Sequence, residues 1–180
     1  MTQHGHRWAM AGLFVLVSWF LLFLIQTRDA QAAAKKISGT SQKGVIVSST
    51  KMWPGDAPHH EIILQHELSV EHSDDPECTT AQVTRVIIID HTAGQGTIRV
   101  YDVDTCPHGD QTFVAGEGTI KTGKQPDGSM EVTGEGKWWY TGGTGTFKGI
   151  TGGGTAKTKE ILGKPESFRS EWAGEYELKP

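Results

Sequence analysis

The chain of 180 residues contains no asparagine. This excludes N-linked glycosylation, which needs an Asn-x-Ser/Thr acceptor, and any catalytic role that depends on an asparagine side chain. Cysteine is nearly absent as well, with only Cys78 and Cys106. We expect a disulfide between them, which would close a loop of about 28 residues and contribute about 3 kcal/mol. The alternative is two unrelated buried thiols.

The chain also lacks an excess of positive charge, because 17 basic side chains face 21 acidic ones and the formal net charge is −4. Nucleic acid is therefore not expected as a partner. The glycine-rich stretch 142–154 has neither Gly-Lys-Ser/Thr nor a correctly spaced Gly-x-Gly-x-x-Gly, which argues against a nucleotide site. The histidines and acidic residues show no metal-ligand spacing, and we predict no cofactor and no metal site.

Helical periodicity is missing after residue 33. Apolar residues instead recur with a period of two, which is typical of β-strands. Strands are expected from Val45 onward, over residues 60–72, 83–89, 98–101, 112–121, 130–140 and 168–178. The pattern predicts an all-β fold, a small antiparallel barrel of about eight strands.

One long uncharged run is present, from Trp8 to Ile25, preceded by basic residues and followed by Ala-x-Ala sites. This order is typical of a secretory signal, so residues 1–32 are interpreted as a hydrophobic targeting helix that is cleaved on export to the periplasm or beyond. A run of about 18 residues also nearly spans a bilayer, so an uncleaved anchor stays open. Either way, this segment is the expected contact with a membrane.

The rest of the chain suits a single domain. Residues 33–43 show no periodicity and are predicted to be a linker, leaving residues 44–180 as the β-domain. In the strand over 60–72, Ile62, Leu64, Leu68 and Val70 share one face, which we expect to be buried. Glu67 and Glu71 fall on the other face, which we expect to meet water.

Glycine is abundant, and most of the 23 glycines lie between Gly94 and Gly174, many inside strands. Three clusters, starting at Gly116, Gly134 and Gly152, are evenly spaced and predict a glycine belt across neighbouring strands. Glycines inside strands suit the bends and close contacts of a small closed sheet.

Residues 140–154 carry a family resemblance. Gly142, Gly143, Thr144, Gly145, Phe147, Gly149 and Gly152 form a Gly-Gly-Thr-Gly-x-Phe element with a returning glycine strand, and this element resembles a late-strand signature of the allene oxide cyclase and dirigent barrel superfamily. The resemblance implies an antiparallel eight-stranded barrel with an apolar lumen, in families that cyclise or orient lipid and phenolic intermediates or have no known activity. The plant cyclases use an asparagine that this chain lacks, so no catalytic residue is carried over.

Two functions stay open. The first is an exported, non-catalytic barrel that binds a small hydrophobic ligand or a protein partner, such as a second copy of itself. The second is an isomerase or cyclase that acts on a lipid-like or phenolic intermediate, with Glu117 or Glu135 handling charge inside the lumen. The expected ligand-binding residues are the aromatics of the apolar strand faces: Phe113, Trp138, Tyr140, Phe147, Trp172 and Tyr176. Trp139, on the opposite face, is expected to be exposed.

Overall fold

A computed structural model describes residues 33–179 of the chain, and the predicted signal peptide, residues 1–32, lies outside them. The described part is all-β, with nine antiparallel strands and one 3-10 turn, η1 (Gly145–Phe147). The strands are β1 (Lys35–Ser41), β2 (Val45–Met52), β3 (His60–Ser73), β4 (Thr80–Thr92), β5 (Gln95–Thr105), β6 (Gln111–Lys124), β7 (Met130–Gly143), β8 (Ile150–Ile161) and β9 (Lys164–Leu178).

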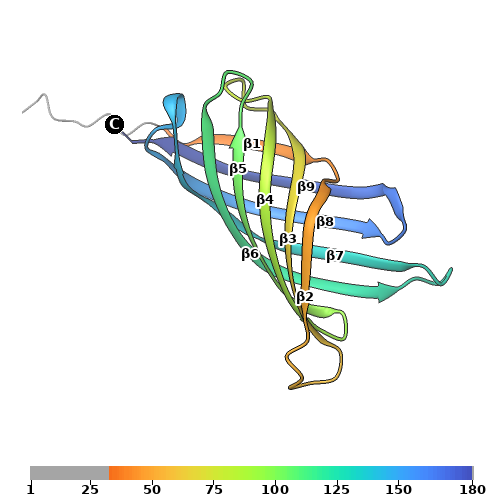
Figure 1. The fold of residues 1–180 in the computed structure, drawn as a ribbon. Helices are drawn as coiled ribbons and strands as arrows, with labels where there is room; N and C mark the ends of the chain where they lie inside the picture. Colours follow the sequence, from red (N-terminus) through yellow and green to blue (C-terminus); the bar gives the residue numbers. More distant parts are fainter. Residues whose placement is uncertain (1–32, 180) are drawn as a thin grey trace, which may run out of the picture. The chain divides into compact units, whose positions relative to one another are not determined.

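The sheet closes on itself through β1 (Figure 1). Each strand from β3 to β9 pairs with its successor, and β1 pairs with β9 on one edge and with the end of β3 on the other. The result is a barrel-like ring made of β1 and β3 to β9. β2 continues along β3 below β1, from Val45 opposite Leu68 to Met52 opposite Ile62, and its other edge has no partner strand within residues 33–179.

The structure corrects two predictions. Residues 35–41 are not a linker, because they form the strand that closes the ring, with Ile37 and Ser41 buried. The faces of β3 are also reversed: Leu64 and Leu68 are 49% and 48% exposed, whereas Glu67 and Glu71 line the interior. Alternation separates two faces of a strand but does not decide which one points inward. Here the counter-charge for the inward carboxylates comes from Arg85 of β4, which is half-buried, lies opposite Glu67 and forms an ion pair with Glu71.

The predicted glycine belt exists. Gly118 lies opposite Gly136 on β6 and β7, and Gly154 lies opposite Gly174 on β8 and β9. These positions face the interior, where the indoles of two tryptophans lie against backbone that has no side chain. A Cβ on Gly39 would stand 2.3 Å from Trp172 Cζ2, so the glycine makes the room that this indole occupies.

One end of the ring is filled by a hydrophobic core. Its buried residues are Ile37, Cys106, Phe147, Ile150 and Tyr176, with Cys78, Trp138, Tyr140 and Trp172 packed against them. The predicted disulfide between Cys78 and Cys106 is present and ties the connection after β3 to the end of β5. The positive φ values of Gly145 (52°) and Gly149 (79°) allow the tight turn that places Phe147, 3% exposed, in this core.

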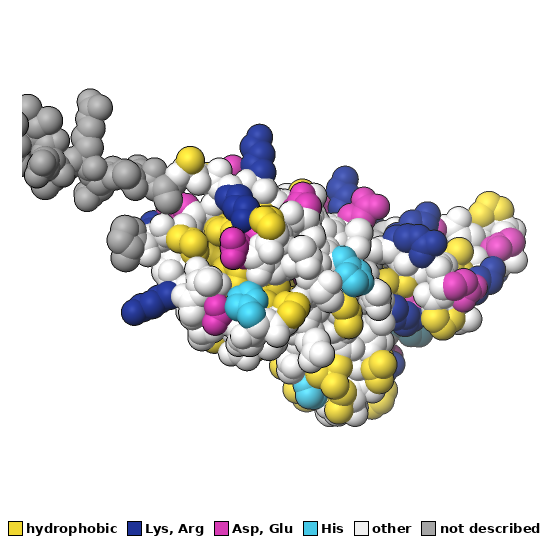
Figure 2. Space-filling view, turned by 90° about the horizontal axis from the view of Figure 1, so that it is seen from above, with side chains coloured by type: hydrophobic (Ala, Val, Ile, Leu, Met, Phe, Trp, Pro, Cys, Tyr) yellow, Lys and Arg dark blue, Asp and Glu magenta, His cyan; other side chains and the backbone are white. Residues whose placement is uncertain are grey.

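The outer surface carries many hydrophobic side chains, which gather in the lower part of the view in Figure 2. The exposed ones include Leu64, Leu68, Val86 and Tyr101 on neighbouring strands β3, β4 and β5, together with Trp139, which is 40% exposed as predicted. Among residues 33–179, no helix has the length and apolar character needed to cross a bilayer.

Candidate functional site: a lumen with one acidic wall

The ring encloses a cavity of about 330 Å³. Below the core, the ring is lined by aliphatic side chains from β4, β5, β6 and β7, including Ile87, Ile89, Ile98, Ile120 and Val132, and by Phe168 from β9. Small residues, Gly116, Gly118, Gly136 and Ala156, keep the centre open. The lower part of the lumen therefore suits an apolar group.

A polar network occupies one wall, on β3, β4 and β5. The pairing register of these strands places its members side by side, because Glu67 lies opposite Arg85 and Arg85 lies opposite Asp102 on successive strands. Arg85 donates to both oxygens of Asp102, at 2.9 and 2.7 Å, and to Glu71 Oε1 at 2.8 Å. Glu71 Oε1 also accepts from the Ser41 hydroxyl. This wall holds more carboxylates than cations.

Burial alone would lower the pKa of Arg85, but the carboxylates of Asp102 and Glu71 outweigh it and raise that pKa, so the guanidinium stays charged. Burial raises the pKa of Glu67, and the attraction of Arg85, whose Nη1 lies 3.8 Å away, offsets this only in part. At the opposite end from the core, Lys43 forms an ion pair with Glu160, close to Glu67. Arg85 and Lys43 are thus both already paired with carboxylates.

One carboxyl group of the wall, that of Asp104, is only partly hydrogen-bonded. Its Oδ2 accepts a hydrogen bond from the Thr112 hydroxyl at 3.0 Å, but its Oδ1 is buried and has no partner among the described residues. Burial raises the pKa of this carboxyl well above its usual range, and repulsion from Glu71 and Asp102 adds to the effect. Asp104 therefore presents a buried carboxyl group, protonated over an unusually wide pH range, to the cavity that it lines.

Aromatic rings form the facing wall, on β7 and β9. Trp138 packs edge-on against both Tyr140 and Trp172, with ring centroids 5.2 and 5.8 Å apart. Burial, reinforced by the negative charge of Asp104, raises the pKa of Tyr140, so its hydroxyl is a stable donor. Within residues 33–179 we find no hydrogen-bond partner for the buried Nε1 of Trp172.

The structure brings four of the six expected ligand-binding residues to the cavity: Trp138, Tyr140, Phe147 and Trp172. Phe113 does not line it, since it alternates with the lumen-facing Thr112 and Val114 on β6. Tyr176 is buried in the core beside the cavity, where its hydroxyl donates to Asp75 Oδ2 at 2.8 Å and Lys35 contacts the other oxygen of the same carboxylate.

The acidic wall was missed from the sequence. Glu117 and Glu135, which the cyclase alternative places inside the lumen, are exposed residues that border the cavity and alternate with the lumen-facing glycines of β6 and β7. One signal was available: Arg85 is the only charged residue on the face of β4 that also carries Ala81, Val83 and Ile87. A lone arginine on a buried strand face requires carboxylates opposite it.

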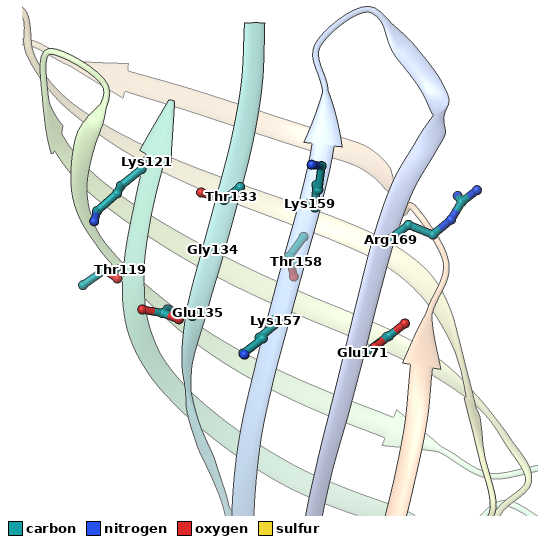
Figure 3. A pocket seen from close by; sticks show the side chains of 10 residues that line it. All are labelled: Thr119, Lys121, Thr133, Gly134, Glu135, Lys157, Thr158, Lys159, Arg169 and Glu171. Carbon is teal, nitrogen blue, oxygen red and sulfur yellow. The ribbon is translucent and has the colours of Figure 1, made fainter. Parts of the chain in front are cut away.

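A second depression, of about 430 Å³, lies over β6 to β9 (Figure 3). Its charged side chains are of both signs: Lys121, Lys157, Lys159 and Arg169 stand among Glu135 and Glu171. Four cations outnumber two carboxylates there, Lys159 is already paired with Glu131 at 2.6 Å, and none of the lining residues is hydrophobic. We therefore place the candidate site in the lumen.

The part of the chain that the structure describes holds no group of three or more histidine, cysteine or acidic side chains arranged to bind a metal ion. Comparisons with known proteins add no assignment, because no protein-family model and no curated protein matches this chain.

Proposed function

We propose that this protein is an exported binding protein whose closed sheet works as a small barrel, holding one small, mainly apolar molecule in its lumen. The observation that carries the proposal is the cavity of about 330 Å³, with aliphatic side chains at one end, aromatic rings on one wall and a few polar groups on the other. Ligand sites of proteins commonly combine apolar walls with a few convergent polar groups.

Binding of a neutral fluorescent probe, N-phenyl-1-naphthylamine, tests this function. We expect a large increase in probe fluorescence with a stoichiometry of one. Ala156→Phe adds a ring inside the lumen, where Ala156 lies between Gly136 and Trp172, and should abolish the increase. Ala173→Phe places the same ring on the exposed face of β9 and should leave binding intact. Equal binding by both variants would locate the probe outside the lumen and refute the proposal.

A second function is favoured by Asp104. A neutral carboxyl with one free oxygen, near a protonated Tyr140, can deliver a proton to an oxygen of a bound molecule and take a proton back, as an isomerase or cyclase requires. This agrees with the resemblance to cyclising barrels. Incubation with a lipid epoxide, followed by chiral chromatography, tests it: Asp104→Asn should remove any excess of one product enantiomer. A racemic product with the unmodified protein would reject catalysis on this substrate.

Export is part of the proposal and is supported by the disulfide, since such bonds persist mainly in oxidising compartments. The expected site of action is the periplasm or the medium, or the outer surface of a membrane if residues 1–32 remain as an anchor. Mass spectrometry of protein from the exported fraction tests this through its N-terminus. A mature start near residue 33 is expected, and intact chain confined to the cytoplasm would refute export.

Self-association is also proposed. Leu64, Leu68, Val86 and Tyr101 expose apolar surface on adjacent strands, and monomeric proteins seldom expose large contiguous apolar patches. Sedimentation velocity is expected to show an oligomer that dissociates with Leu64→Glu. A monomer at all concentrations would refute this part.

A further inference from the structure

We propose that the ligand of this lumen carries a positive charge: it is an amphiphilic organic amine whose ammonium group lies between the Asp104 carboxylate and the aromatic wall. The inference rests on the proposed binding function and specifies its ligand class. Three independent features carry it: the charge of one wall, the free oxygen of Asp104, and the aromatic rings opposite.

The first feature is the charge balance inside the ring. Glu71 and Asp102 share the single guanidinium of Arg85. Lys43 is paired with Glu160, and Lys35 with Asp75. None of these three cations is left for Asp104, although it faces the same cavity, and Lys137, which borders the cavity, is an exposed residue that alternates with Gly136 and Trp138 on β7. A positive ligand would supply the missing charge, whereas a carboxylate or phosphate ligand would be repelled by every acidic group on this wall.

The second feature is an unfilled hydrogen-bonding position. Asp104 Oδ1 is buried without a partner, and buried polar atoms are normally bonded. An ammonium donor would satisfy it with a charge-assisted hydrogen bond, which is stronger than the bond that a neutral hydroxyl would make.

The third feature is the wall across the ring. The strand order places β3, β4 and β5 opposite β7, β8 and β9, so the carboxylates face Trp138, Tyr140 and Trp172 across the lumen. Cations are attracted to the faces of tryptophan and tyrosine rings, most strongly where water is excluded. The aliphatic end of the cavity, around Ile98 and Ile120, would receive the apolar part of the amine.

Binding of an ammonium ion must be linked to the ionisation of Asp104. In the empty lumen this carboxyl holds its proton to higher pH than an ordinary aspartate, so an arriving cation displaces that proton. The affinity for the amine therefore rises with pH until Asp104 is ionised. The titratable groups that act on Asp104 are Glu71 of β3, Arg85 of β4, Asp102 of β5 and Tyr140 of β7, and Tyr140 is in turn influenced by Asp75 after β3 and Tyr176 of β9.

The experiment compares 2-naphthylmethylamine with 2-naphthalenemethanol, which has the same shape without the charge, and with 2-naphthoate. Isothermal titration at neutral pH is expected to show the amine binding about tenfold more tightly than the alcohol, with no binding of the acid. Heats measured in phosphate and in Tris should differ for the amine alone, because only the amine releases a proton.

Asp104→Asn is expected to bring the affinities for the amine and the alcohol within about threefold of each other while the alcohol still binds. Glu175→Gln removes a carboxylate from the exposed face of β9, away from the cavity, and should preserve the preference. If Asp104→Asn does not fold, the unmodified protein decides: amine affinity should rise with pH, and alcohol affinity should not. Alcohol binding as tight as amine binding would overturn the inference and leave the binding function standing. Failure of both, and of N-phenyl-1-naphthylamine, would overturn the binding function itself.

Discussion

The indole of Trp138 occupies the space that a side chain on Gly174 would need. A Cβ on Gly174 would stand 2.7 Å from Trp138 Cζ2 and 2.4 Å from the carbonyl oxygen of Gly153, so both the ring and the neighbouring strand would have to shift. The glycine belt therefore provides the space in which the rings of the aromatic wall pack.

Gly174→Ala should destabilise the fold by about 1–3 kcal/mol, the usual cost of overpacking. Gly123→Ala is a matched control, because a Cβ there meets nothing within 4 Å and its φ is not positive. Urea denaturation of the two variants measures the difference. Equal stability of the two variants would mean that the packing of the rings does not depend on the glycine at position 174.

Arg85→Met should cost about 3–5 kcal/mol, because it leaves the carboxylates of Glu71 and Asp102 buried without their counter-charge. Arg99→Met, on the exposed face of β5, is the control and should change little. Thermal unfolding at neutral pH compares the two variants. A loss in Arg85→Met no larger than that in Arg99→Met would refute the role of Arg85 as the counter-charge.

The double variant Cys78→Ser/Cys106→Ser should lose about 3 kcal/mol of stability relative to the bridged protein. Dithiothreitol should lower the stability of the unmodified protein by a similar amount and leave the double variant unchanged. The comparison needs only urea denaturation with and without reductant. An unmodified protein that is insensitive to complete reduction would show that the bridge is dispensable.

The stability of the empty protein should depend on the ionisation of Asp104. Its pKa is raised in the folded state, so the folded protein binds a proton more readily than the unfolded chain over the range between the two pKa values. Stability is therefore lost as pH rises from the unfolded pKa, about 3.9, through the folded one. Asp104→Asn should be more stable than the parent above that range, and the difference should fade towards acid pH. Urea denaturation across pH measures it; a difference of constant size would refute the assignment.

Local periodicity was enough to predict most strands, because alternation depends only on neighbouring residues. It could not decide which face of β3 points into the ring, where Leu64 is exposed and Glu67 faces the lumen. That choice depends on Arg85 and Asp102, which lie on other strands and reach Glu67 only through register.

β1 escaped prediction for a related reason. Only Ile37 and Ser41 of this strand are buried, and it carries two lysines and a glycine, so its own sequence gives only a weak strand signal. It is held by hydrogen bonds to β9 and β3, which are far away along the chain. The aromatic part of the site was predictable from strand alternation, whereas the acidic wall needed three strands in register.

The position of β1 between β9 and β3 has a consequence for folding. From β3 to β9, each pairing joins strands that are consecutive in the chain and can form as a hairpin soon after both are made, and the β1–β3 pairing skips only β2. The β1–β9 pairing joins nearly opposite ends of the described residues, and bringing such distant segments together carries the largest loop-closure entropy in the fold. We therefore expect β1 to pair last, and the wall of the lumen is complete only when β1 has paired with both β9 and β3.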